Sequence, residues 1–403
     1  MKGEDVLLIG IDGGATEAKA HAAACDDLDN ATAFELRSEA ASRIYPPAAG
    51  FVPVPVMEQF TQRDAGKIEL TAGEVAQGKL WVAAAAEAAV EVARTCGARC
   101  VLVGMGMPGL KTPDGRGINV INNGPRIPDY LQQLEQHITA AELELAAPVA
   151  ALGSDADYCG LGEEYAAEGL FRDVGNAYYV GCGTGVADAM KLHGKLVPFD
   201  AAKSWLQKSW QMPSALGATF EKLVSAKSLN RVFEEMTEVT KRRSDEATEG
   251  ACATASQSPF PEAAAIEGNP VAVAWMDTAA LVMAELIFER LWTIKNGRAE
   301  APHHGEAYLA LDANHEYRGT LLDRVVIGQR LGMIYADARF ADVFSMKLDK
   351  NLATLIADSD DAELIAACLA SDGKALQPGF VCASKLRAAP ALGAAVAAVR
   401  SHM

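Results

Sequence analysis

The sequence predicts an α/β protein that is organised as two lobes with mixed β-sheets. Two observations support this fold class. The chain has 403 residues, of which 50% are hydrophobic, and this is enough for two lobes that each bury a core. Short apolar runs of the strand type also alternate with longer, alanine-rich stretches of the helical type, which is typical of α/β proteins.

The predicted elements follow from these runs and stretches. Strands are expected at residues 6–11, 100–103, 149–152, 177–180 and 324–327, and helices at 80–95, 129–145, 271–296 and 391–399. Residues 241–262 are polar and low in complexity, so they are expected to form an exposed loop. Residues 42–63 are rich in Pro and Val and are expected to wrap a surface before the first long helix.

Charge and composition exclude several partners. The net charge of -17 and the isoelectric point of about 4.9 argue against nucleic acid and against anionic membranes. No apolar run approaches the roughly 20 residues of a membrane span, and the start MKGEDVLL lacks the features of a signal peptide, so a cytoplasmic protein is expected. The eight cysteines are scattered without a CxxC pair, which favours reduced thiols over a structural zinc site.

One glycine motif is interpreted as a decoy. The stretch GMGMPG at residues 104–109 matches the dinucleotide-binding pattern G-x-G-x-x-G. That pattern requires a helix to begin inside it, whereas the residues that follow, KTPDG, form a turn sequence. A dinucleotide site is therefore not expected here, and the sequence contains no P-loop motif either.

The stretch GIDGGATEAK, residues 10–19, has the composition of a tight hairpin after a buried strand. Gly13 and Gly14 leave backbone N–H groups uncovered, and such groups bind anions. Asp12 would repel a phosphate unless a cation stood between them, which makes it a candidate for a water-mediated Mg²⁺ anchor. Thr16 and Lys19 add a hydroxyl and a positive charge. A plain hairpin turn without a ligand is the alternative.

Two further segments repeat and extend this chemistry. In YYVGCGTGVADAMKLHGKL, residues 178–196, Gly183, Thr184 and Gly185 form a second glycine-threonine hairpin that could face the first across a cleft. In GSDADYCGLGEE, a strand ends before two acids and a helix follows. Asp155 is placed to accept a proton from a substrate hydroxyl, and its alternative role is a helix N-cap, which Asp157 suits better.

Taken in order, these segments resemble the ROK group of sugar kinases, within the actin-like ATPase superfamily. Asp12 to Thr16 is similar to the first phosphate motif of that group, and especially to its form in N-acetylglucosamine kinases. The other resemblances are the G-x-G-x-P-G substrate loop at 104–109, the catalytic segment at 148–164, the second phosphate motif at 183–185, the adenosine loop at 325–332 and a closing helix at 390–398.

The resemblance implies an actin-like (ribonuclease H-like) fold with two lobes, each a mixed β-sheet flanked by helices, and an ATP cleft between the lobes. The N-terminal lobe would comprise residues 1–125, completed by 388–403, and the C-terminal lobe residues 126–387. ATP and Mg²⁺ are the implied cofactors, a sugar the implied small-molecule partner, and a homodimer a family expectation.

The implied site residues fall into two sets. The cofactor-binding set is Asp12, Gly13, Gly14, Thr16, Lys19, Gly183, Thr184, Gly185, Gly328 and Gln329, with Asp12 also serving the metal. The substrate-binding set is Gly106, Pro108, Asn122, Asn123, Ser154, Asp155 and Glu221.

Some positions depart from the family pattern. Ser154 stands where an asparagine is usual, Ala187-Asp188 replace glycines, and Gln329-Arg330 replace glycine in the adenosine loop. The family zinc cluster is absent, and residues 201–217 stand in its place. A Trp in that segment could stack on a sugar, although packing in a core or interface is favoured because of its large apolar area.

The implied function is ATP-dependent phosphorylation of a hydroxyl on a hexose, an amino sugar or a related sugar, with Asp155 as the general base. Two alternatives remain open. One is an actin-like ATPase that acts as a nucleotide switch on a protein partner. Some proteins of this kind hold an iron–sulfur cluster, and Cys96 and Cys100 are poor candidates for its ligands. The other is a kinase-like sugar-sensing protein without catalysis.

Overall fold

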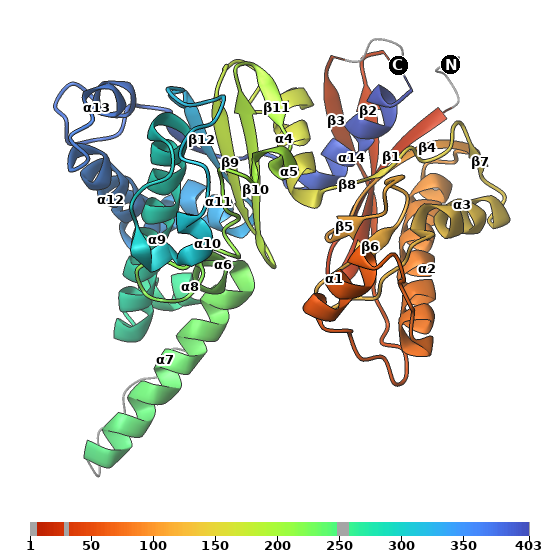
Figure 1. Ribbon diagram of the computed structural model, residues 1–403, viewed down its shortest axis with the longest axis horizontal. Coiled ribbons are helices and arrows are strands. Elements are labelled where there is room, and N and C mark those ends of the chain that lie inside the picture. Colours follow the sequence, from red (N-terminus) through yellow and green to blue (C-terminus); the bar gives the residue numbers. More distant parts are fainter. Residues whose placement is uncertain (1–5, 28–31, 248–257, 403) are drawn as a thin grey trace. The chain divides into compact units, whose positions relative to one another are not determined.

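The computed structural model describes residues 6–27, 32–247 and 258–402, which form two compact units (Figure 1). Unit 1 comprises Met1–Arg172 and Leu386–Met403, and unit 2 comprises Asp173–Lys385. The prediction of an α/β fold with mixed sheets flanked by helices is confirmed. The division differs from the expected one at residue 125, because the elements between residues 126 and 172 pack within unit 1.

Unit 1 is built on a mixed sheet whose described strands have the order β3-β2-β1-β4-β7, with β8 also paired to β4. The strands β1, β2 and β3 form an antiparallel meander, while β4 runs parallel to β1 and is joined in parallel by β7 and β8. The bounds are β1 (Val6–Gly13), β2 (Glu17–Cys25), β3 (Phe34–Ile44), β4 (Cys100–Gly106), β7 (Glu144–Leu145) and β8 (Leu152–Gly153).

Both faces of the unit 1 sheet are covered, because successive residues of a strand point to opposite faces. Leu7, Ile9 and Ile11 of β1 pack with α2 (Ala72–Thr95) and α3 (Tyr130–Ala140). Leu8 packs on the other face with α14 (Ala389–Arg400), which also contacts α4 (Asp155–Tyr165). The predicted C-terminal helix therefore completes unit 1.

The contact between α14 and the sheet requires glycine at two positions. A Cβ atom on Gly10 would lie 1.8 Å from the carbonyl oxygen of Ala391, and one on Gly104 would lie 1.8 Å from that of Ala394. The helix backbone therefore rests directly on β1 and β4. Three small elements complete unit 1, namely α1 (Val56–Asp64), β5 (Leu110–Lys111) and β6 (Ile118–Val120).

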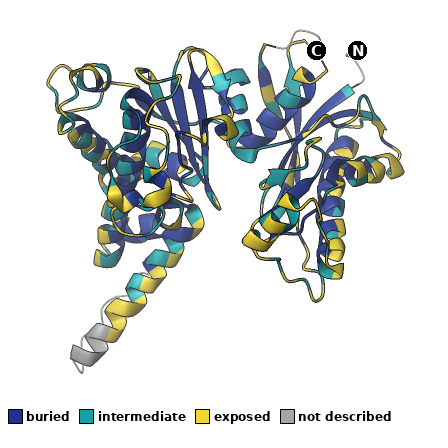
Figure 2. Cartoon of the chain, viewed as in Figure 1, coloured by how far each residue is buried: buried dark blue, intermediate teal, exposed yellow. Residues whose placement is uncertain are grey.

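Unit 2 is built on a second mixed sheet, with its described strands in the order β11-β10-β9-β12-β13. The strands β9, β10 and β11 are antiparallel, whereas β12 and β13 run parallel to β9. Their bounds are β9 (Ala177–Cys182), β10 (Val186–Leu192), β11 (Lys195–Val197), β12 (Arg324–Gly328) and β13 (Val381–Ala383). The inner strands β1, β4, β9, β10 and β12 are mostly buried, whereas β3 at the edge of its sheet is mostly not (Figure 2).

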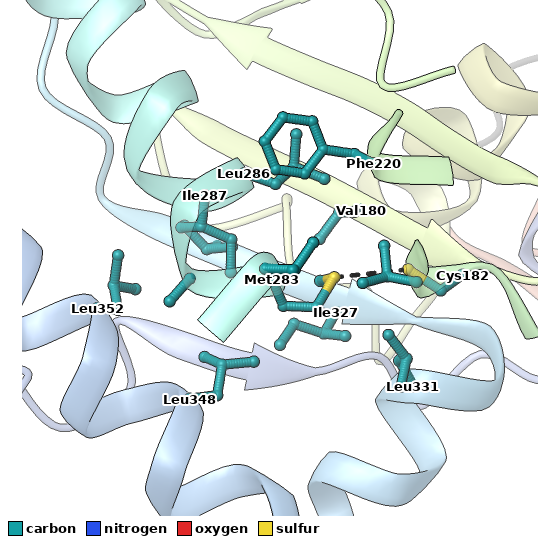
Figure 3. Packing of buried hydrophobic residues seen from close by; sticks show 14 of the residues in the cluster. Val180, Cys182, Phe220, Met283, Leu286, Ile287, Ile327, Leu331, Leu348 and Leu352 are labelled. Carbon is teal, nitrogen blue, oxygen red and sulfur yellow. Dashed lines mark hydrogen bonds between the residues drawn. The ribbon is translucent and has the colours of Figure 1, made fainter. Parts of the chain in front are cut away.

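The core of unit 2 lies between this sheet and its longest helices. Figure 3 shows Val180 of β9 and Ile327 of β12 packed near Met283, a residue of α9 (Pro270–Asn296). The thiol of Cys182, at the end of β9, lies 3.8 Å from the Met283 sulfur. Other helices are α5 (Phe199–Ala202), α6 (Phe220–Val224), α7 (Ala226–Ala247), α8 (Pro261–Ile266), α10 (Glu306–Leu309), α11 (Gln329–Ala336), α12 (Met346–Ala357) and α13 (Ala362–Cys368), with short helical turns at Pro302–His304, Ala338–Phe340 and Ala341–Ser345.

The predicted loop at residues 241–262 is wrong at both of its ends. Residues 241–247 continue α7, which extends away from the rest of unit 2, and α8 begins at Pro261 (Figure 1). Residues 248–257 lie outside the described part of the chain. The polar composition of 241–247 therefore belongs to the end of a helix rather than to a loop.

The helix α9 also differs from expectation. Its most apolar window has a mean hydropathy of 1.8, so by length and composition it meets the requirement for a membrane span. It is interrupted by polar residues, which is why a search for uninterrupted apolar runs missed it. In the structure, 56% of that window is buried within unit 2, and core helices of globular units pass the same test.

Candidate active site

The ends of three neighbouring strands bring the predicted acids of unit 1 together. In the sheet register, Asp12 of β1 lies beside Gly106 of β4, and Gly106 lies beside Gly153 of β8. Asp155 begins α4 two residues after Gly153, and its Cα atom lies 3.7 Å from the position of a Cβ atom on Gly106. The carboxylates of Asp12 and Asp155 therefore stand at one edge of the sheet.

This arrangement changes the acidity of Asp12. The pKa of the Asp12 carboxyl is raised to about 6, chiefly by burial and also by the negative charges of Asp155 and Glu17, while the positive charge of Lys19 acts in the opposite direction. Lys19 itself forms an ion pair with Glu17, two residues earlier on the same strand β2, at 2.9 Å. The net effect is a carboxyl whose negative charge needs a compensating cation.

The residues present fit a magnesium ion held in part by water. The described residues contain no cluster of three or more His, Cys, Asp or Glu side chains that could hold a metal by themselves. Mg²⁺, however, usually keeps several waters and takes only one or two carboxylates together with phosphate oxygens. Asp12, a carboxylate at the end of β1, could supply such a ligand through water.

The first hairpin uses its two glycines in different ways. A Cβ atom on Gly13 would lie 1.9 Å from the sulfur of Met107, so Gly13 is required for packing. The Gly14 N–H donates to the Glu17 carbonyl oxygen at 2.9 Å and closes the turn, so this amide is not uncovered as expected. Ala15 and Thr16 are exposed at the tip, so their amides and the Thr16 hydroxyl are the groups of this hairpin that face solvent.

The helix that carries Asp155 is capped by Ser154 and not, as expected, by Asp157. The Ser154 hydroxyl accepts a hydrogen bond from the Asp157 N–H at 3.4 Å. Asp155 is thus left as the first residue of α4, where the helix dipole stabilises a negative charge. The Tyr158 ring fixes this helix against the sheet, because a Cβ atom on Gly153 would lie 1.9 Å from the ring.

The loop after β4 does not form a dinucleotide site. The segment from Gly104 to Gly109 is followed by β5 and a turn instead of a helix, as the turn sequence predicts. Gly109 has a φ of 91° and approaches the Val120 carbonyl oxygen so closely that a Cβ atom there would lie 2.5 Å away. Pro108 and Gly109 therefore lie beside the segment that leads into Asn122.

Asn122 and Asn123 are exposed at the tip of that segment. Asn123 has a φ of 58°, which places it in the left-handed region that asparagine tolerates better than most residues. Among the described residues of unit 1, neither side chain has a hydrogen-bond partner. Their amides are therefore available to a ligand with several hydroxyl groups.

In unit 2, the second predicted phosphate hairpin joins β9 to β10. The Gly183 N–H donates to the Gly185 carbonyl oxygen at 2.9 Å, and the Gly183 carbonyl oxygen accepts from the Ala226 N–H at 2.7 Å. Gln329 packs against the same hairpin, since a Cβ atom on Gly183 would lie 1.8 Å from its side-chain oxygen. The structure thus brings Gly183 together with Gly328 and Gln329, which follow β12.

Glu221 supports this hairpin. Its carboxylate accepts a hydrogen bond from the Val186 N–H at 2.9 Å, and a Cβ atom on Gly185 would lie 2.8 Å from the same oxygen. A contact from α6 to the start of β10 has no signature in the sequence, because the two residues are far apart along the chain. The predicted contact of Glu221 with sugar hydroxyls stays a prediction.

Two departures from the family pattern have structural roles. The buried Asp188 accepts hydrogen bonds from Tyr178, from Ser209 at 3.1 Å and from Arg290 at 3.3 Å, and so fastens the 201–217 segment to the sheet. Arg330 pairs with Glu262 at 2.8 Å and also donates to the Ala226 carbonyl oxygen. These charges stabilise the unit and are not free to bind a ligand.

The two tryptophans of the 201–217 segment differ from each other. Trp205 is buried and stacks on His315, with ring centroids 4.1 Å apart, which agrees with the packing role that was favoured. Trp210 is 51% exposed.

No family model matches the sequence, and no curated protein matches it. The fold is nevertheless similar to solved structures over nearly the whole chain. A ROK-family glucokinase from Streptomyces griseus, in complex with glucose and AMPPNP, is 14% identical, with a TM-score of 0.53 and coverage of 98% of this chain and 99% of that one. A ROK hexokinase from Thermus thermophilus is 15% identical, with a TM-score of 0.52 and coverage of 98% and 99%. A ROK-family transcriptional regulator, a homologue of the E. coli MLC protein, is 14% identical, with a TM-score of 0.53 and coverage of 98% and 79%.

Proposed function

Since this chain has the fold of the ROK-family sugar kinases, we propose that it transfers the terminal phosphoryl group of ATP to a hydroxyl of a sugar or sugar derivative. One observation carries the proposal. The carboxylates of Asp12 and Asp155 stand at one edge of the unit 1 sheet, beside the Gly106 loop. A metal anchor next to a candidate general base is the pair of groups that this reaction needs.

Asp155 acts as the general base in this proposal. The acceptor hydroxyl oxygen attacks the terminal phosphorus, its proton passes to the Asp155 carboxylate, and the bond between that phosphorus and the bridging oxygen of ADP breaks. Phosphoryl transfer needs little covalent help from the protein, so positioning of the acceptor carries much of the rate. Asn122 and Asn123 orient the sugar by hydrogen bonds, and Gly106, Pro108 and Ser154 of the same unit contact it.

The remaining residues hold the nucleotide. The exposed tip at Thr16, together with Lys19, and the hairpin at Gly183, Thr184 and Gly185 bind phosphate oxygens, and Gly328 and Gln329 lie at the adenosine. Mg²⁺, when bound, neutralises phosphate charge, and Asp12 holds it through water. The raised pKa of Asp12 supports this role, because a bound cation would stabilise the ionised carboxylate.

The test is a coupled ADP-release screen with ATP and Mg²⁺ over hexoses, amino sugars and anhydro sugars. We expect at least one sugar to stimulate ADP release, and the Asp155→Asn variant to lose roughly 100-fold or more of that rate, since general base catalysis typically contributes that much. The variant should still bind ATP, because Asp155 faces the acceptor. A variant that keeps full turnover would remove the base assignment.

The same screen separates the two alternatives. If calorimetry shows that a sugar binds and the screen shows no ADP release with it, a sugar-sensing protein would be favoured. ATP hydrolysis that no sugar changes would favour a nucleotide switch on a protein partner. Either outcome would replace the kinase proposal.

A further inference from the structure

The connection between β3 and α2, residues 45–71, is bonded to the loop that carries Asn122 and Asn123. The first bond is made by Gln59, a fully buried residue of α1. Its side-chain nitrogen donates to the Ile121 carbonyl oxygen at 2.9 Å, and its side-chain oxygen accepts from the Ile121 N–H at 2.8 Å. The amide of Gln59 therefore pairs with Ile121 as a neighbouring strand would, one residue before Asn122.

The second bond is made by Arg126, on the other side of the two asparagines. Its guanidinium is fully buried and binds both carboxylate oxygens of Glu74, each at 2.7 Å. It also donates to the side chain of Gln62 in α1 and to the Glu69 carbonyl oxygen. Glu74 is in turn held by a capping box with Thr71 at the start of α2. A bidentate pair of this kind fixes orientation as well as distance.

Between these two bonds the loop has little freedom. The backbone of Ile118 pairs with that of Ile127 through two hydrogen bonds, of 2.8 and 3.0 Å, and closes the base of the loop. Gly124 lies directly on Trp81, where a Cβ atom would be 2.8 Å from the indole ring. The loop is held at its base, on both flanks and from below, while the side chains of Asn122 and Asn123 remain exposed.

We infer that Gln59 and Arg126 are positioning residues that set the affinity for the acceptor sugar, and that the β3–α2 connection is the element of unit 1 that tunes it. The inference rests on the proposed function, in which Asn122 and Asn123 bind the sugar. A loop that is already ordered loses less freedom when it binds a ligand, so a loosened loop binds more weakly although every contacting side chain is still present.

The chain offers a matched control in Gln77 of α2. Its buried side-chain amide makes the same kind of paired bond to the same connection, accepting from the Ala48 N–H at 2.7 Å and donating to the Pro46 carbonyl oxygen at 3.0 Å. These bonds lie at the start of the connection and involve no residue from 121 to 126. Substitution of Gln59 by methionine removes three bonds to backbone groups, one of them to the Val54 carbonyl oxygen at 2.7 Å, and substitution of Gln77 removes two. The side-chain length is conserved in both variants.

The experiment compares Gln59→Met with Gln77→Met in amide hydrogen exchange and in steady-state kinetics, with the sugar that best stimulates ADP release. Gln59→Met should speed exchange at Ile121 and raise the KM for the sugar by about tenfold, while the KM for ATP stays within about twofold. Gln77→Met should leave the KM for the sugar within about twofold of the wild-type value. Its thermal stability should nevertheless fall, as that of Gln59→Met does, because it also loses buried hydrogen bonds. If Gln59→Met does not fold, Gln62→Met should also raise the KM for the sugar, because it removes the bond from Arg126 to Gln62, together with the bonds of Gln62 to Glu58 and to the Glu69 N–H.

The outcomes separate this inference from the function on which it rests. If the wild-type protein phosphorylates a sugar and the two matched variants change the KM for that sugar equally, the positioning role is wrong and the kinase proposal stands. If no sugar in the screen is bound or phosphorylated by the wild-type protein, the kinase proposal fails and the positioning role fails with it.

Discussion

The carboxylates of Asp12 and Asp155 lie close enough for the charge of Asp155 to raise the pKa of Asp12. The register of β1, β4 and β8 brings them together, since Asp12, Gly106 and Gly153 stand side by side at the strand ends. Two negative groups in a partly buried place repel each other, and a cation or a proton relieves that repulsion. This relationship is the physical basis of the first two predictions.

The Asp155→Asn variant should lower the pKa of Asp12 from about 6 toward its ordinary value of 3.8. The decrease should be partial, because burial is the largest cause of the raised value and remains in the variant. A carbon-detected NMR titration of the Asp12 carboxyl measures this directly. An unchanged pKa in the variant would show that the two carboxyls do not interact.

The stability of unit 1 should decrease as the pH rises through about 6. The pKa of Asp12 is raised in the folded state above its ordinary value of 3.8, so the folded state holds this proton more tightly than the unfolded state does. Its contribution to the free energy of unfolding is therefore complete below about pH 4 and is lost between about pH 4 and 7, by about 3 kcal/mol. Denaturant unfolding of the wild type minus that of Asp12→Asn should give this curve, and a flat difference would contradict it.

Replacement of Gly104 by alanine should destabilise unit 1 by about 3 kcal/mol or more, because the added methyl group would overlap the helix backbone of α14. Gly175→Ala is the control, since a Cβ atom there meets only Asp323 at 3.7 Å. Thermal unfolding and limited proteolysis of residues 386–403 should both report the difference. Equal stability of the two variants would show that α14 does not rest on the sheet as described.

Removal of the Asp188 carboxylate should destabilise unit 2 by about 3–5 kcal/mol, because Arg290 would keep a buried charge with one partner fewer. Asp173→Ala is the control. It breaks the ion pair with Arg324, in which Asp173 is 69% exposed, and should cost about 1 kcal/mol or less. Chemical denaturation measures both. Faster hydrogen exchange in the 201–217 segment of Asp188→Ala would further show that Asp188 fastens it.

The sequence predicted the fold class because its local patterns agree with the tertiary structure. The run that became β1 is apolar throughout, as expected for a strand buried on both faces, and the Ala-rich stretches became the helices that cover it. The boundary between the units was misplaced because no linker composition marks residue 172 or 385. The assignment of α14 to unit 1 depended on the family resemblance, because the sequence of a short apolar helix does not indicate which sheet it packs against.

Candidate residues could be named from the sequence where a residue type has its own chemistry, whereas contacts that depend on the fold could not be foreseen. Asp12 and Asp155 could be named because a carboxylate that follows a strand can serve a metal ion or accept a proton. The bond of Glu221 to the Val186 N–H and the pairing of Gln59 with Ile121 join distant parts of the chain. A glutamine on a helix looks the same in the sequence whether its side chain faces solvent or pairs with the backbone of a distant residue.

Because α14 covers one face of β1 and β4, the order of synthesis on the ribosome matters for this protein. Residues 173–385 are made without interruption, so unit 2 has all of its elements before translation ends. The earlier strands of unit 1, in contrast, must wait for residues 389–400, and until then Leu8 and Leu102 lack the part of their cover that α14 provides. Nascent chains arrested before residue 389 should therefore expose an apolar, aggregation-prone surface and recruit chaperones, whereas chains that include residues 389–400 should not.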